Sequence, residues 1–297
     1  MSSYSAEQLA LYFNHINYPR ARHSTDPLQF VTELQQHHLL RVPFESLSLH
    51  YSKDKEISLD PQKLFTKIVV NGRGGYCLEN NTFFGEILRS LGFRVIGVVC
   101  RISNSSRGIH DGGWRKMSHM AIVVHIGHTR YLVDVGYGAD GPTFPIPLNS
   151  GQTSTDPRCQ FVKLEYKRLP QHVDPNQRVW VYSKLTKNKT WSDIYHFIDA
   201  EFFAQDFLIL NGHNMTRSFF ADNVVVQRFI RTETGSFASH ILVRDTLKLR
   251  DDSTEEVLEV YQNEAQRIAG LERVFQIFLS SEEISAIRGS NSELAQA

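Results

Sequence analysis

The first 70 residues place their apolar side chains at helical intervals. Residues 9–16 carry Leu, Tyr, Phe and Ile three and four positions apart, behind a Ser5-to-Gln8 spacing that is typical of a capping box. Residues 26–40 and 60–70 repeat this period, and each begins with an aspartate that suits the N-cap position. The pattern predicts an N-terminal region built of helices.

A glycine-rich turn, NGRGGYC at residues 71–77, interrupts the helical pattern and ends at Cys77. Apolar side chains then return at i, i+3, i+4 and i+7 over residues 84–91, and Gly92 follows as a C-terminal stop. This order predicts that Cys77 lies at or next to the N-terminus of a helix.

From residue 93 the period changes to that of strands. The runs rich in Val, Ile, Tyr and Phe are residues 93–102, 120–126, 130–138, 161–169 and 178–185. They predict a β meander or a small barrel. The second and third runs are joined by Gly127, His128 and Thr129, a short connection that favours a hairpin, so these two strands should pair directly.

The last third of the chain mixes both periods. Strand signals at 223–230 and 240–250 alternate with helical stretches at 194–210 and 263–279. The fold class predicted from these changes is α+β. The three predicted domains are helical residues 1–92, β-barrel residues 93–205 and α/β residues 206–297.

Composition excludes several classes of protein. The chain of 297 residues is 41% hydrophobic and 22% charged, values of an ordinary globular protein, and its 32 basic and 32 acidic residues cancel. We therefore expect neither a nucleic acid nor a membrane as partner. The N-terminus has no signal-peptide pattern, and three scattered cysteines are unlike a disulfide framework. A cytoplasmic location is expected, and the oligomeric state is left open.

Cys77 is the candidate nucleophile among the three cysteines. A thiol attacks acyl groups as the thiolate, which a helix N-terminus and a neighbouring cation favour. Cys100 and Cys159 lie on strand-like segments without a glycine turn, where a free cysteine is more typically a small buried hydrophobe.

His119 and Asp134 are the candidate partners of this thiol. Nucleophilic catalysis needs a base that can carry positive charge and a third group that orients it. His119 directly precedes the first strand of the predicted hairpin, and Asp134 lies near the end of the second, flanked by valines in an apolar run. Because an unpaired buried carboxylate is costly, a histidine on the adjacent strand is its expected partner.

Four sequence blocks resemble those of the arylamine N-acetyltransferases. They are VPFESLSLH, RGGYCLENN, SHMAIVV and YLVDVGYG, in this order. The resemblance implies an N-terminal helical bundle, a central β-barrel and a C-terminal α/β lid around a cysteine-protease-like active-site core. It also implies that Cys77, His119 and Asp134 form a catalytic triad.

Further residues match positions of that family. Phe44, Ile102 and Tyr137 match positions that line its acceptor pocket. Arg73 and Glu45 match a structural pair that holds the RGG turn against the upstream block, and we interpret Arg73 as structural.

The segment NGHNMTRSFFADNVVV resembles, less closely, the stretch where the family contacts coenzyme A. It places Thr216 and Ser218 at the hydroxyl positions but lacks the family's common proline. Arg217 between them either pairs with a CoA phosphate or faces solvent. Arg115 and Lys116 leave the same two alternatives open.

The activity that the resemblance implies is transfer of an acetyl group from acetyl-CoA to arylamines or hydrazines, as in xenobiotic metabolism, by a ping-pong acyl-cysteine mechanism. No tightly bound cofactor is expected, and no metal, because the sequence lacks HExxH and CxxC motifs. Propionyl-CoA or malonyl-CoA would use the same chemistry. The alternatives are a hydrolase of the papain or transglutaminase type and a non-catalytic binder.

Overall fold

The computed structural model describes residues 4–155, 160–251 and 254–294. Its N-terminal part is helical, as predicted. The helices are α1 (Ala6–His15), α2 (Pro27–Arg41), α3 (Pro61–Phe65), continued by a π turn at Thr66–Val70, and α4 (Cys77–Ser90). The predicted caps form, since Ser5, Asp26 and Asp60 each accept hydrogen bonds from backbone N–H groups of the first helical turn.

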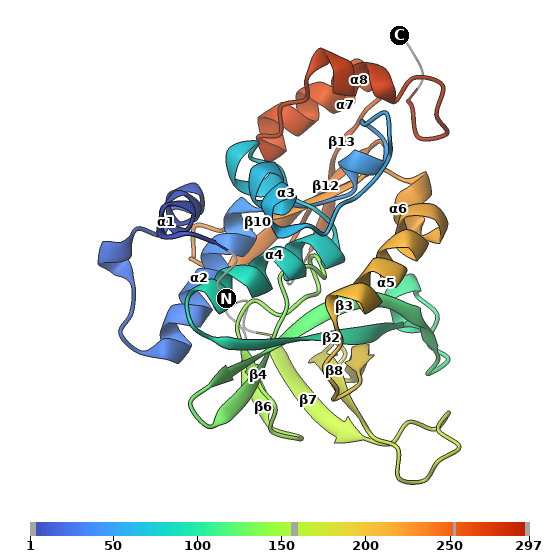
Figure 1. Ribbon diagram of the computed structural model, residues 1–297. Coiled ribbons are helices and arrows are strands. Elements are labelled where there is room, and N and C mark those ends of the chain that lie inside the picture. The colour runs from blue at the N-terminus through green and yellow to red at the C-terminus, as the bar shows by residue number, and fades with distance from the viewer. Residues whose placement is uncertain (1–3, 156–159, 252–253, 295–297) are drawn as a thin grey trace.

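The central part is an eight-stranded antiparallel sheet that curls into a nearly closed barrel below α4 (Figure 1). Its strand order is β5-β4-β3-β2-β9-β8-β7-β6. The strands are β2 (Arg94–Ser103), β3 (Trp114–Ile126), β4 (Thr129–Val133), β5 (Ile146–Pro147), β6 (Thr153–Thr155), β7 (Phe161–Lys167), β8 (Val179–Leu185) and β9 (Trp191–Phe197). The predicted hairpin is β3–β4, which closes with Ile126 paired to Thr129.

A second, five-stranded sheet has the order β1-β10-β11-β12-β13. Its strands are β1 (Phe44–Glu45), β10 (Val225–Arg231), β11 (Phe237–Val243), β12 (Thr246–Arg250) and β13 (Glu255–Val260). The remaining helices are α5 (Ala204–Arg217), α6 (Phe219–Asp222), α7 (Glu264–Gly270) and α8 (Ser281–Ala286). Because β1 comes from the N-terminal part, this sheet joins both ends of the chain. The predicted domain boundaries stay a prediction.

One prediction of local structure was wrong, and a second, a strand at 240–250, was confirmed as strand but in two pieces. The stretch 194–210 was expected to be helical, but its first residues belong to β9, and helix begins only at Ala204. Pairing with β2 and β8 on both sides decides the conformation there, since backbone hydrogen bonds of a sheet outweigh a weak helical period. The run 240–250 divides into β11 and β12 at Arg244, whose φ of 58° makes a turn.

The main core lies between α4 and the barrel. Leu78, Phe84 and Leu88 of α4 are buried in one hydrophobic cluster with Ile122 of β3 and Val133 of β4. This packing holds the first turn of α4 above the β3–β4 hairpin. Within the described residues, no helix has both the length and the apolar character that crossing a bilayer requires.

Candidate active site

Cys77 is the first residue of α4, and the turn before it is packed too tightly for any side chain. A Cβ atom on Gly74 would lie 1.8 Å from the carbonyl oxygen of Pro43, and one on Gly75 would lie 2.5 Å from Glu79. Only glycine fits these two positions. The turn therefore places the thiol at the helix start, where unpaired N–H groups favour negative charge.

His119 on β3 and Asp134, directly after β4, meet beside this thiol. Nε2 of His119 lies 2.7 Å from Oδ2 of Asp134, and the two residues are 2% and 1% exposed. The Cys77 thiol lines the same cavity as the imidazole, and its Sγ donates to the carbonyl oxygen of Ser118, the residue before His119 (3.7 Å). The structure thus brings together the three side chains that the sequence predicted.

The imidazole of His119 is held in its charged form. Burial opposes the charge, but the carboxylate of Asp134, its hydrogen bond and the Cys77 thiol outweigh burial and raise the pKa of His119 to about 10. The rings of Tyr137 and Tyr195 flank the imidazole, each with its centroid 5.2 Å away.

The raised pKa of His119 predicts a pH-dependent contribution to folding. Because its folded-state pKa of about 10 exceeds the unfolded value of about 6.5, the stabilisation is complete below about pH 6.5 and is lost as the pH rises through the folded value. Between those pH values, wild type should lose about 4 kcal/mol of unfolding free energy relative to His119→Gln, measured by urea denaturation. A constant difference between the two proteins would contradict this expectation.

Asn81 is a residue of the site that the sequence reasoning missed. Its Nδ2 donates to Oδ1 of Asp134 (2.9 Å), and its Oδ1 accepts from the backbone N–H of Val135 (3.0 Å). The backbone N–H of Gly136 also donates to Oδ1 of Asp134 (2.8 Å). The signal was available, because Asn81 follows Cys77 by four residues and so lies on the same helix face.

Cys100 has the structural role expected of it. Its side chain is fully buried in β2, and burial raises the pKa of its thiol well above the ordinary range. Such a thiol is inert. The matching prediction for Cys159 concerns a residue outside the described part of the chain.

A cavity of about 430 Å³ opens beside the thiol and the imidazole. All three residues predicted to bind the acceptor, Phe44, Ile102 and Tyr137, lie in its wall. The complete lining is Phe44, Cys77, Ile102, Ser106, Arg107, Arg115, Lys116, Ser118, His119, Gly136, Tyr137, Asp140, Asn214, Ser218, Phe219 and Phe220. The wall next to the reacting groups is therefore aromatic, as recognition of a flat apolar ligand requires.

The residues predicted to bind CoA stand at the end of α5, not in a loop. Ser218 lines the cavity, and its hydroxyl donates to the Asn214 carbonyl (2.6 Å) while it caps α6. Thr216 donates to the Gly212 carbonyl (3.0 Å), and both Thr216 and Arg217 are exposed outside the described lining of the cavity. Their contact with CoA stays a prediction.

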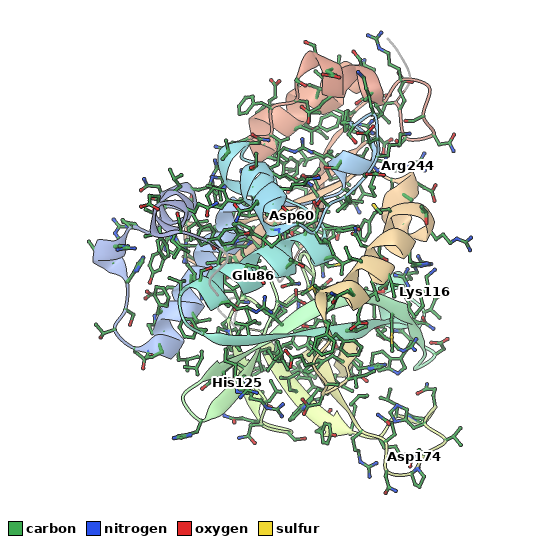
Figure 2. The ribbon with its side chains drawn as sticks, in the orientation of Figure 1. Asp60, Glu86, Lys116, His125, Asp174 and Arg244 are labelled. Atoms are coloured by element: carbon green, nitrogen blue, oxygen red, sulfur yellow. The ribbon has the colours of Figure 1, made fainter. Side chains whose placement is uncertain are left out.

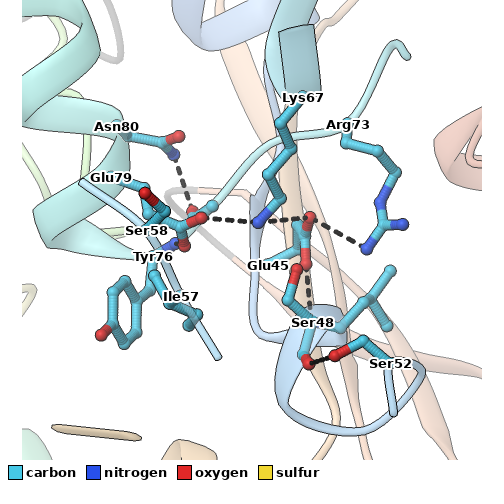
Figure 3. A network of polar contacts seen from close by, with 12 residues as sticks. Glu45, Ser48, Ser52, Ile57, Ser58, Lys67, Arg73, Tyr76, Glu79 and Asn80 are labelled. Atoms are coloured by element: carbon cyan, nitrogen blue, oxygen red, sulfur yellow. Dashed lines mark hydrogen bonds and ion pairs between the residues drawn. The ribbon is translucent and has the colours of Figure 1, made fainter. Parts of the chain in front are cut away.

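A buried network of charges supports the glycine-rich turn from below (Figure 3). Glu45 forms ion pairs with Arg73 (3.3 Å) and Lys67 (3.5 Å), so the predicted pair of Arg73 and Glu45 is present. Lys67 also binds Glu79 (2.6 Å), whose other oxygen accepts the N–H that begins α4. Arg73 reaches Glu283 of α8 (2.8 Å), which ties the C-terminal helix to the turn.

Arg73→Met is expected to lower the free energy of unfolding by about 3 kcal/mol, because it leaves the buried carboxylate of Glu45 short of one cation. Chemical denaturation measures this loss. Lys53→Met is the matched control, since Lys53 is an exposed residue that pairs with Glu282 on the same helix α8 (2.6 Å). It should cause no measurable loss. Equal effects of the two variants would rule out a supporting role for Arg73.

Known proteins are similar to this chain over most of its length. The family model described as N-acetyltransferase matches residues 27–284. The N-malonyltransferase FDB2 of Gibberella moniliformis is 30% identical, over 96% of this chain and 92% of its own length. The arylamine N-acetyltransferase 2 of Mus musculus is 29% identical, over 84% of this chain and 86% of its own.

Solved structures share the fold. The arylamine N-acetyltransferase of Mycobacterium abscessus superposes with a TM-score of 0.79 at 23% identity, covering 94% of this chain and 93% of that one. The M. tuberculosis enzyme gives a TM-score of 0.75 at 26% identity, with coverages of 95% and 94%. Since the family model spans most of the chain and the fold agrees, this protein is an enzyme of the arylamine N-acetyltransferase family.

Proposed function

We propose that the protein is an acyl-CoA-dependent N-acyltransferase that acylates arylamines or hydrazines through an acyl-Cys77 intermediate. The observation that supports it most is the contact of Cys77, His119 and Asp134 at the wall of an aromatic cavity. A helix start presents the sulfur, an imidazolium lies beside it, and a buried carboxylate holds the imidazolium.

In the first half-reaction, the Cys77 sulfur attacks the carbonyl carbon of the acyl-CoA thioester. A new carbon–sulfur bond forms, the bond to the CoA sulfur breaks, and CoA leaves as a thiol with the proton of His119. Asp134 keeps the imidazole in the orientation that this proton transfer needs (2.7 Å).

In the second half-reaction, the amine nitrogen attacks the acyl-Cys77 carbonyl. His119 accepts the proton from nitrogen, the bond to the Cys77 sulfur breaks, and the thiolate–imidazolium pair is restored. Tyr137, edge-on to the His119 ring, and Phe44 are the proposed walls for the aromatic ring of the acceptor.

Exclusion of water decides between transfer and hydrolysis, because a cysteine hydrolase uses the same three groups. The burial of Cys77 (4% exposed) and His119 (2%) supports transfer. Phe220, from the α6 segment, closes the cavity and packs on Phe44 at 5.4 Å between ring centroids.

Incubation with acetyl-CoA, with and without aniline, tests the proposal. Without an amine, we expect each active site to release one CoA, after which CoA release stops. With aniline or phenylhydrazine, we expect CoA release to continue and the N-acyl product to accumulate. Steady CoA release at the same rate without amine, or peptide cleavage without CoA, would identify a hydrolase.

Malonyl-CoA is a second candidate donor. Relatives from Gibberella moniliformis and Fusarium pseudograminearum, 30% and 32% identical, are named N-malonyltransferases. Rates of CoA release from acetyl-, propionyl- and malonyl-CoA with one amine rank the donors. Ser218, Thr216 and Arg217 are the residues proposed to contact CoA, and a reducing, cytoplasmic setting suits the free Cys77 thiol.

A further inference from the structure

One side of the catalytic cavity carries three cations. Arg107 ends the turn after β2, and Arg115 and Lys116 begin β3 (Figure 2 labels Lys116 beside α5). Arg115 is half-buried, whereas Arg107 and Lys116 are exposed. Two irregularities in the β2–β3 pairing, next to Cys100 and Ser103, lie at this point. Such bulges redirect side chains, and here consecutive residues of one strand both line the cavity.

The guanidinium of Arg115 has no carboxylate partner among the described residues. The one acidic residue in the described lining, Asp140, is already held by Lys184 (3.2 Å) and Arg250 (2.8 Å). Burial and the like charge of Arg107 lower the pKa of Arg115. Two cations close together at a partly desolvated wall repel each other, and a bound anion between them relieves that repulsion.

Arg115 lines the same cavity as the reacting groups Cys77 and His119. Tyr137 lines it too, and its ring lies 5.2 Å from the His119 ring. The Cα atoms of Arg115 and His119 are four strand residues apart, at most about 13 Å. The free carboxylate of a malonyl thioester is only two bonds from the carbonyl carbon that Cys77 attacks. A cation on the Tyr137 side of the cavity is therefore placed for an anion on the acyl group.

We propose that Arg115 binds the free carboxylate of a dicarboxylic acyl group, such as malonyl, and so makes the enzyme select donors with an anionic acyl chain. The proposal rests on the proposed acyl transfer. Arginine suits this task because its planar guanidinium binds a carboxylate through two parallel hydrogen bonds. The phosphates of CoA share the anionic chemistry, and the experiment separates the two sources.

The test compares kcat/KM for malonyl-CoA and propionyl-CoA, which differ by a carboxylate in place of a methyl group. Arg115→Met should lower the malonyl-to-propionyl ratio by about 10- to 100-fold, since a charge-assisted hydrogen bond is lost. Arg115→Lys should restore part of the ratio. Arg94→Met is the matched control, because Arg94 is an exposed arginine at the opposite end of β2 and should leave the ratio unchanged.

Malonyl- and propionyl-pantetheine, which lack the CoA phosphates, repeat the comparison. The same loss of ratio in Arg115→Met supports the acyl-carboxylate site. In the contrary outcome, Arg115→Met lowers kcat/KM equally for malonyl-CoA and propionyl-CoA and leaves kcat/KM for the pantetheine donors unchanged. That result assigns Arg115 to a CoA phosphate and overturns the proposal. An unchanged ratio in Arg115→Met also overturns it.

An equilibrium measurement separates failure of this inference from failure of the proposed function. On Cys77→Ala, calorimetry with malonyl-CoA and propionyl-CoA should show tighter binding of malonyl-CoA, and Arg115→Met in that background should remove the difference. Equal binding of the two donors overturns the inference even where wild type transfers acetyl groups. If wild type transfers no acyl group from any donor, the proposed function is wrong, but the binding measurement still tests the role of Arg115.

Discussion

Cys77→Ala is expected to lose acyl transfer by roughly a millionfold, down to the background rate, while it keeps its fold. The sulfur is the acyl acceptor of the proposed scheme and lines the same cavity as His119. The start of α4 does not depend on the thiol, because the N–H of Tyr76 is bound by Glu79 (3.0 Å). The rate of CoA release measures the loss of turnover. The mass of the protein after incubation with acetyl-CoA measures the loss of the acyl adduct.

Cys100→Ala is the matched control for this experiment. Cys100 is also buried, and it is paired in register with His119 on the neighbouring strand, so both variants remove a thiol next to the same imidazole. We expect Cys100→Ala to keep the acyl adduct on Cys77, with a modest loss of stability. Undiminished turnover of Cys77→Ala, or an adduct on Cys100, would refute the assignment of the nucleophile.

Asp134→Asn is expected to lower kcat by about 10⁴-fold. The carboxylate stabilises the imidazolium of His119 through Oδ2 and accepts the N–H groups of Asn81 and Gly136 through Oδ1. An amide has one oxygen for these two sets of partners. If its oxygen faces His119, its NH₂ meets two donors; if its NH₂ faces His119, the imidazole must change tautomer.

The pH titration of His119 by NMR distinguishes this mechanism from simple misfolding. In Asp134→Asn the pKa of His119 should fall well below its wild-type value of about 10, because the carboxylate that raises it is gone. Asn81→Ala is the companion variant: it removes one donor to Asp134 but leaves the charge, so kcat should fall less. Asp134→Asn with a near wild-type kcat would remove Asp134 from the triad.

Much of the site was predictable because its signals are local. A cysteine at the end of a glycine-rich turn and before a helical period lies at a helix start, whatever the rest of the fold does. A three-residue connection pairs the strands of His119 and Asp134 for the same reason. Acceptor-pocket residues Phe44 and Tyr137 were located through their sequence blocks, and they do share one cavity.

What the local pattern could not supply depends on contacts between distant segments. The stretch 194–197 is strand because β2 and β8 pair with it on either side. Its own sequence contains no feature that predicts this pairing. The sequence does not decide the role of Arg115, because a charged residue at the start of a strand can either face solvent or bind a ligand. Only the tertiary structure shows that Asp140, the one acidic residue in the described lining of the cavity, is already paired to Lys184, and that Arg115 has no carboxylate partner among the described residues.

The sequence by itself therefore determined the helix start at Cys77 and the β3–β4 hairpin beside which His119 and Asp134 meet, because each is encoded within a few consecutive residues. It also indicated the family, through four short blocks in a fixed order. Tertiary structure decided how α4 lies on the barrel, and hence that Asn81 closes on Asp134 and that the thiol meets the imidazole. Those two pairs of residues are 53 and 42 positions apart. They arise only when the apolar face of α4 is buried against the sheet.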